Sequence, residues 1–259
     1  MIDWNPILQE LSDKIQSSVL TVIHQRNSMP VQRFKDLLDK QAQDAILETL
    51  GKLDVGIKLV SEEGDQVFSD GRYTMVADPV DGTTNLARGL SPAVTSISVS
   101  ETDHQSGAVA GIVTNFFTGE TFYAEKGMGA TLDGAPINVA PDIKYRHGMI
   151  GMDISKNPAM DKLGKLIGAS RHVRQQGCCA MSLCNVAEGT LDAHIDLRGF
   201  VRTTDISAGL LMIREAGGVY AINGELFGDM ELTQSTKVEL VAASNPRLLE
   251  EIESIRGGI

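Results

Sequence analysis

Aromatic residues, cysteines and long apolar runs are all scarce in this chain of 259 residues. Its three cysteines lie in one short stretch (Cys178, Cys179 and Cys184), so no second cluster supplies zinc-site spacing, and the odd number favours free, buried thiols. No apolar run approaches the ~20 residues needed to cross a bilayer. The acidic N-terminal segment does not resemble a signal peptide. We therefore expect a cytoplasmic protein without disulfides.

Positive charge is also in deficit, because 23 Lys and Arg oppose 34 Asp and Glu, a formal net charge of −11. Such a field repels the phosphates of nucleic acids and anionic membranes, so we expect neither as a partner. An acidic protein that acts on a phosphorylated small molecule must neutralise charge locally, with metal ions or a few arginines. The histidines form no metal-spaced pair: His24, His104, His147, His172 and His194.

Hydrophobic periodicity predicts an α/β fold in two halves. Residues 1–142 read as an α+β half, with two amphipathic helices ending near residues 28 and 51. Strands are expected at about 57–60, 73–77, 93–100, 107–114 and 120–124, and a hairpin-like stretch continues to 139. Residues 143–259 read as an α/β half. Strands are expected there near 148–152, 171–174, 191–196 and 239–243, and helices near 159–168, 179–188, 205–216 and from 246.

Two carboxylates follow a predicted strand in the stretch Asp78-Pro79-Val80-Asp81-Gly82-Thr83-Thr84-Asn85. Pro79 disfavours the α conformation at Asp78, and a turn would bring Asp81 back towards it. Two carboxylates this close repel each other unless a cation lies between them, and Mg²⁺ prefers such hard oxygen ligands. A surface turn is the alternative, since Asp-Pro and Asp-Gly are common turn dipeptides.

Two further acidic features lie at the ends of predicted elements. Glu62 and Glu63 follow the strand at 57–60, and Asp205 begins the helix at 205–216, where the helix dipole favours a carboxylate. By itself, Asp205 is better interpreted as a helix cap or a first-turn acid. Spacing along the sequence does not establish that these groups converge.

Together, Glu62-Glu63, the segment 78–85, and Asp205 with Glu215-Ala216-Gly217-Gly218 resemble the signature segments of the inositol monophosphatase family. The segment 191–205 is most similar to the archaeal branch, whose enzymes hydrolyse both fructose 1,6-bisphosphate and inositol monophosphate. The resemblance covers most of the chain. It implies a layered α-β-α-β-α sandwich, a homodimer and a role in carbohydrate metabolism.

The resemblance also implies residue roles. Glu62, Asp78 and the Val80 carbonyl would hold one Mg²⁺, while Asp78, Asp81 and Asp205 would hold a second. The catalytic residues would be Thr83, Asp39 and Glu62, with Thr83 orienting the attacking water. Whether a third metal binds is left open, because residues 25–33 carry none of the acids or glycines that position it in many relatives.

Substrate contacts follow from the same resemblance. Asp81 and the N–H groups of Gly82 and Thr83 would surround the phosphate, and Cys179 would line the sugar pocket through its backbone. Arg174 and Arg198 match positions that bind the sugar phosphate, and Arg202 lies nearby.

The sequence thus predicts a Mg²⁺-dependent phosphomonoester hydrolase that acts on small sugar and polyol phosphates. Two alternatives stay open. One is a nucleotide phosphatase acting on phosphoadenosine phosphate, which the low aromatic content of 5% disfavours because a base needs a stacking pocket. The other is a weakly catalytic relative that acts through a protein or RNA partner.

Overall fold

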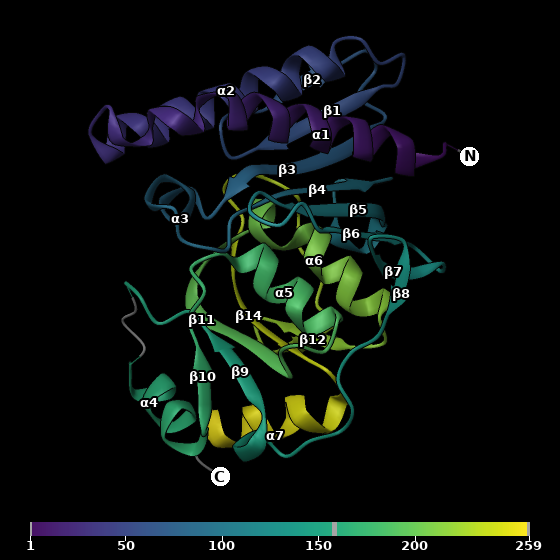
Figure 1. Ribbon diagram of the computed structural model, residues 1–259. Coiled ribbons are helices and arrows are strands. Elements are labelled where there is room, and N and C mark those ends of the chain that lie inside the picture. The colour runs from purple at the N-terminus through teal and green to yellow at the C-terminus, as the bar shows by residue number, and fades with distance from the viewer. Residues whose placement is uncertain (1, 157–159, 258–259) are drawn as a thin grey trace.

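The computed structural model describes residues 2–156 and 160–257, and shows five layers of alternating helices and sheets (Figure 1). The layers run from the helices α1 (Trp4–Val22) and α2 (Val31–Leu50) through a first sheet, a central helix pair and a second sheet to an outer helix pair. The predicted α-β-α-β-α sandwich is therefore confirmed. Across the described residues, no helix is long and apolar enough to span a membrane.

The first sheet has eight strands in the order β2-β1-β3-β4-β5-β6-β7-β8. Only β1 and β3 pair in parallel, and every other neighbouring pair is antiparallel. Helices α1 and α2 cover one face, where Leu11, Phe34 and Ile112 are buried in a common core. The strands are β1 (Ile57–Ser61), β2 (Gln66–Phe68), β3 (Tyr73–Asp81), β4 (Val94–Ser100), β5 (Ala108–Asn115), β6 (Thr121–Glu125), β7 (Gly129–Leu132) and β8 (Ala135–Ile137).

The central layer consists of α5 (Cys179–Ala187) and α6 (Thr203–Glu215), which lie between the two sheets (Figure 1). All nine residues of α5 are buried, as expected of a helix that is covered on every side. Gly209 of α6 faces Leu183 of α5, where a Cβ atom would lie only 2.6 Å from the leucine Cβ. This glycine therefore allows the two helices to approach closely.

The second sheet has six strands in the order β10-β9-β11-β14-β12-β13, and α4 (Met160–Ala169) and α7 (Pro246–Gly257) cover its outer face. Strands β9, β10 and β11 pair in parallel, and the remaining pairs are antiparallel. The strands are β9 (Met149–Met152), β10 (His172–Arg174), β11 (Ala193–Arg202), β12 (Val219–Ile222), β13 (Glu225–Leu226) and β14 (Lys237–Ala243).

Strand β3 differs from its prediction in a way that matters for the site. We expected the chain to leave the sheet at Asp78, but β3 continues to Asp81 through a register shift against β4. Pro79 has no N–H to donate to the ladder, and a bulge accommodates that missing donor. The Val80 N–H turns back to the Asp78 carboxylate at 3.0 Å. The bulge thus places Asp78 and Asp81 on a kinked, rigid strand.

Most other expected elements are present within a few residues of their predicted bounds. The expected helix at 159–168 is observed as α4, although its first predicted position lies outside the described residues. The strand expected at 191–196 runs on to Arg202. Strands β2, β12 and β13 were not predicted, and two of these are only two or three residues long.

Candidate active site

Three carboxylates from distant parts of the chain converge between the first sheet and α6. Oxygen atoms of Glu62, Asp78 and Asp205 all lie within 4.8 Å of one another. Glu62 directly follows β1, Asp78 lies on the parallel neighbour β3, and Asp205 lies in the first turn of α6. The convergence of these three predicted metal ligands follows from the parallel pairing of β1 with β3 and from the packing of α6 on the sheet.

Asp78 is the most deeply placed of the three, with a relative exposure of 2%. Its Oδ1 accepts the Val80 N–H, whereas its Oδ2 is buried without a hydrogen-bond partner among the described residues. Burial, reinforced by the nearby charges of Asp81 and Glu62, raises the pKa of Asp78 well above its usual value. An unpartnered buried carboxylate oxygen is costly, so this position favours a bound cation.

Asp81 points towards the start of α5. Its carboxylate accepts the Ala180 N–H at 2.7 Å and lies 3.3 Å from the Cys178 thiol. Burial and the charge of Asp205 raise the pKa of Asp81 to about 7. Asp81 does not belong to the group within 4.8 Å, so its sharing of a metal with Asp205 stays a prediction.

Arg202 is the only cation of the described residues that is ion-paired to this carboxylate group. It forms a two-pronged ion pair with Glu62, and its Nη2 lies 2.9 Å from Asp205 Oδ1 and 3.9 Å from Asp78 Oδ2. The sequence placed Arg202 near the substrate arginines. The structure places it against the carboxylates that are predicted to bind metal, where it balances their charge.

Asp39 and Thr83 lie beside this group, on α2 and at the first position of α3 (Thr83–Arg88). Burial, followed by the charges of Glu63 and Glu62, raises the pKa of Asp39 to about 7, and the Thr83 hydroxyl acts in the opposite direction. The Thr83 hydroxyl donates to the Val80 carbonyl at 2.9 Å. Gly82 precedes α3 with φ +86, a conformation that favours glycine.

The two predicted substrate arginines both lie on the second sheet. Arg174 is exposed on the edge strand β10, where it donates to its neighbour's carbonyl. Arg198 forms a doubly hydrogen-bonded pair with Asp196, at 2.6 and 2.9 Å. Cys179 is buried at the start of α5, and the three cysteines are free thiols, as expected.

Comparison with known proteins decides the family. The inositol monophosphatase family profile matches residues 8–256. The chain belongs to the inositol monophosphatase family. It is therefore a phosphomonoester hydrolase, as the sequence motifs predicted.

Individual relatives agree with this assignment. A fructose-1,6-bisphosphatase/inositol-1-monophosphatase of Thermococcus kodakarensis is 33% identical over 83% of this chain and 80% of its own length. A bifunctional NADP phosphatase/NAD kinase of Methanococcus maripaludis is 27% identical over 85% of this chain and 42% of its own length. The crystal structure of an inositol monophosphatase–fructose 1,6-bisphosphatase superposes with a TM-score of 0.83 and 26% identity, covering 98% of this chain and 100% of the other.

Proposed function

We propose that this protein is a Mg²⁺-dependent phosphatase of small sugar and polyol phosphates, including fructose 1,6-bisphosphate and inositol monophosphate. One observation carries the proposal: the carboxylates of Glu62, Asp78 and Asp205 converge, and Asp78 Oδ2 is buried there without a partner. Relatives named for both substrates support the substrate class. A cytoplasmic location and a homodimer stay predictions.

The donor set suits Mg²⁺, because carboxylate and carbonyl oxygens are its preferred ligands. We assign Glu62, Asp78 and the Val80 carbonyl to one ion, and Asp78, Asp81 and Asp205 to a second. When bound, the ions would polarise the phosphate, lower the pKa of a water nucleophile and stabilise the leaving oxygen. A third ion has no evident ligand in residues 25–33, which contain no acid.

The chain's own residues would orient the reactants. Asp39, with a pKa of about 7, can accept a proton near neutral pH, and Thr83 lies between Asp39 and the Val80 carbonyl to position a water. The N–H groups of Gly82 and Thr83, together with Asp81, would bind the phosphate end of the substrate. Arg174, Arg198 and the backbone of Cys179 are proposed to contact the sugar.

The test is phosphate release from fructose 1,6-bisphosphate and inositol 1-phosphate, measured in parallel with Mg²⁺. We expect activity on both, and a loss of at least ~100-fold in Asp205→Asn and Asp81→Asn, because each variant removes a metal ligand. Asp142→Asn is the matched control, since Asp142 is exposed and pairs only with Arg247 among the described residues. Near wild-type rates in the two ligand variants would contradict the mechanism.

A nucleotide phosphatase is the second candidate, and the NADP phosphatase relative favours it. NADP and phosphoadenosine phosphate therefore belong in the same assay. Release from these nucleotides alone would replace the sugar-phosphate assignment. No activity on any substrate, with Mg²⁺ binding intact, would instead favour a weakly catalytic relative that acts through a partner.

A further inference from the structure

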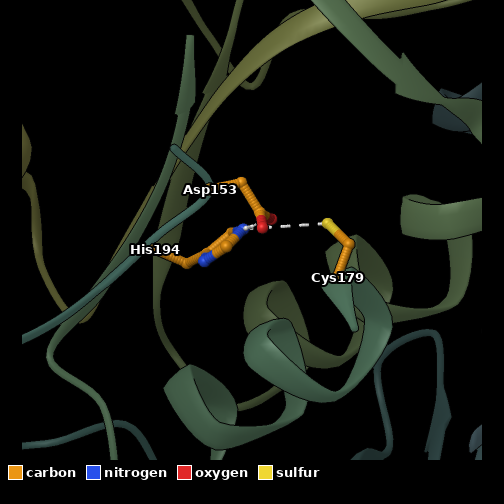
Figure 2. A group of neighbouring side chains, drawn as sticks. All are labelled: Asp153, Cys179 and His194. Atoms are coloured by element: carbon orange, nitrogen blue, oxygen red, sulfur yellow. Dashed lines mark hydrogen bonds and ion pairs between the residues drawn. The ribbon is translucent and has the colours of Figure 1, made fainter. Parts of the chain in front are cut away.

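A second cluster of metal-binding side chains lies apart from the carboxylate group. It consists of Asp153, Cys179 and His194, whose side chains point towards one another in Figure 2. Asp153 follows β9, Cys179 is the first residue of α5, and His194 lies on β11, which pairs with β9. Relative exposures of 6%, 8% and 1% place all three in the protein interior.

The separations within this cluster are close to those expected of ligands around a metal ion. His194 Nε2 lies 3.6 Å from Asp153 Oδ2 and 3.7 Å from Cys179 Sγ. In a tetrahedral zinc site, bonds of ~2.0 Å to nitrogen and oxygen and ~2.3 Å to sulfur place these ligand pairs ~3.3 and ~3.5 Å apart. All three ligand atoms lie within 4.8 Å of one another. The observed separations to His194 are therefore within ~0.3 Å of those expected for ligands around a small ion.

The chemical state of the ligands agrees with this geometry. Burial lowers the pKa of His194, which favours the neutral imidazole, the form that binds metals. No partner among the described residues fixes the tautomer, because the other ring nitrogen, Nδ1, is buried without a hydrogen bond. Burial raises the pKa of the Cys179 thiol. The thiol therefore carries its proton until a metal replaces it.

We propose that Asp153, Cys179 and His194 form a binding site for a zinc-class divalent cation, distinct from the magnesium ligands. A thiolate and an imidazole are softer donors than the oxygens of the carboxylate group and select Zn²⁺ over Mg²⁺. On binding, the Cys179 S–H bond is exchanged for an S–Zn bond and the proton leaves to solvent. With three protein ligands, a water completes four-coordination.

The guanidinium of Arg198 lies beside this cluster. Its Nη2 is ion-paired to Asp153 Oδ2 at 3.8 Å, but the same atom lies closer to Asp196 Oδ2, at 2.6 Å. Arg198 is thus held mainly by Asp196, and its pairing with Asp153 is the weaker of the two. The site also adjoins Cys178, whose thiol lies beside Asp81. A cation here would fix the start of α5 next to the proposed active site.

Cobalt(II) is the probe that tests this inference, because a Co²⁺–thiolate bond absorbs in the near ultraviolet. The metal-free protein is titrated anaerobically with Co²⁺ in excess Mg²⁺, which keeps the oxygen ligands of the active site occupied. We expect one thiolate-bound Co²⁺ per chain, displaced by Zn²⁺. Because the absorption band does not depend on phosphatase activity, this experiment tests the zinc-class site independently of the proposed function.

Matched variants assign the ligands. Cys179→Ala should abolish the absorption band, whereas Cys184→Ala, which alters another buried thiol of α5, should retain it. Asp153→Asn and His194→Asn should weaken Co²⁺ binding at least ~10-fold. Circular dichroism checks that each variant is folded. Absence of a thiolate band in the wild-type protein, or a band that persists in Cys179→Ala, overturns the proposal.

Discussion

Replacing Arg202 with methionine should destabilise the metal-free protein and strengthen its binding of Mg²⁺. In the structure, the Arg202 guanidinium is paired with Glu62 and Asp205 and lies 3.9 Å from Asp78 Oδ2. Without it, three carboxylates whose oxygens lie within 4.8 Å of one another lose their paired cation. Methionine keeps much of the aliphatic stem, so the variant removes mainly charge and hydrogen bonds.

The size of the effect follows from burial. Leaving a buried charge unpaired costs about 3–5 kcal/mol. The side chains of Arg202 and Glu62 are 33% and 31% exposed, and solvent screening reduces the expected loss to about 1–3 kcal/mol. Unfolding entropy of ~2.1 cal/mol/K per residue over 259 residues then gives a fall in Tm of about 2–6 °C. If Mg²⁺ must displace this guanidinium, its removal should tighten Mg²⁺ binding by about tenfold, equivalent to ~1.4 kcal/mol.

Scanning calorimetry with EDTA or with saturating Mg²⁺ measures the first effect, and isothermal titration of Mg²⁺ measures the second. The matched control is Arg256→Met, since Arg256 pairs with Glu239 and Glu253 and has no ion pair with the carboxylate group. Its destabilisation should be the same with and without Mg²⁺. If Arg202→Met behaves in this same way, with unchanged Mg²⁺ affinity, then Arg202 is a structural ion pair and does not compete with the metal.

Three further changes test other parts of the structure. The folded-state pKa of Asp39 is about 7 against a usual value of 3.8, so the native state retains a proton that the unfolded state releases. Stability without metal should therefore fall as pH rises from about 4 to about 7, and Asp39→Asn should flatten this decline in Tm; an unchanged pH profile would contradict the shift. Gly82→Ala places a Cβ at φ +86 and 3.0 Å from the Pro92 carbonyl oxygen, and should cost about 1–3 kcal/mol in urea denaturation. Gly119→Ala is its control, with φ +77 and open space, and should lose less. Gly209→Ala should cost about 1–3 kcal/mol by forcing α5 and α6 apart, whereas Gly164→Ala, a site with open space in α4, should be neutral or stabilising; equal effects would refute the close-packing argument.

Local chemistry explains which features the sequence predicts well. Proline between two aspartates indicates an interrupted ladder, and the structure has a register shift at that position, although the strand continues to Asp81. The helix that carries Asp205 was predicted from its apolar pattern and its terminal glycines, and is observed as α6, which begins at Thr203. Such signals depend on residues close together in sequence. Short strands such as β13, with two residues, carry too little pattern to be recognised.

Contacts between distant segments of the chain could be identified only from the structure. The sequence showed only that Arg202 lies near the predicted substrate arginines, and no spacing rule shows that it reaches Glu62 across the molecule. The cysteines and histidines showed no zinc spacing, because zinc rules describe ligands on one turn or hairpin. Asp153, Cys179 and His194 instead meet where two strands and a helix pack together.

Asp81 shows why neither half of the chain completes the site alone. The spacing of Asp78 and Asp81 suggests that the two carboxylates simply share a cation, and both lie on β3 of the first sheet. In the structure, however, the Asp81 carboxylate accepts a hydrogen bond from the Ala180 N–H of α5, and Asp205 lies on α6. Both helices belong to the C-terminal half. The positions of Asp81 and Asp205 therefore depend on the docking of α5 and α6 against the first sheet, and a change that loosens this layer should weaken metal binding before it unfolds either sheet.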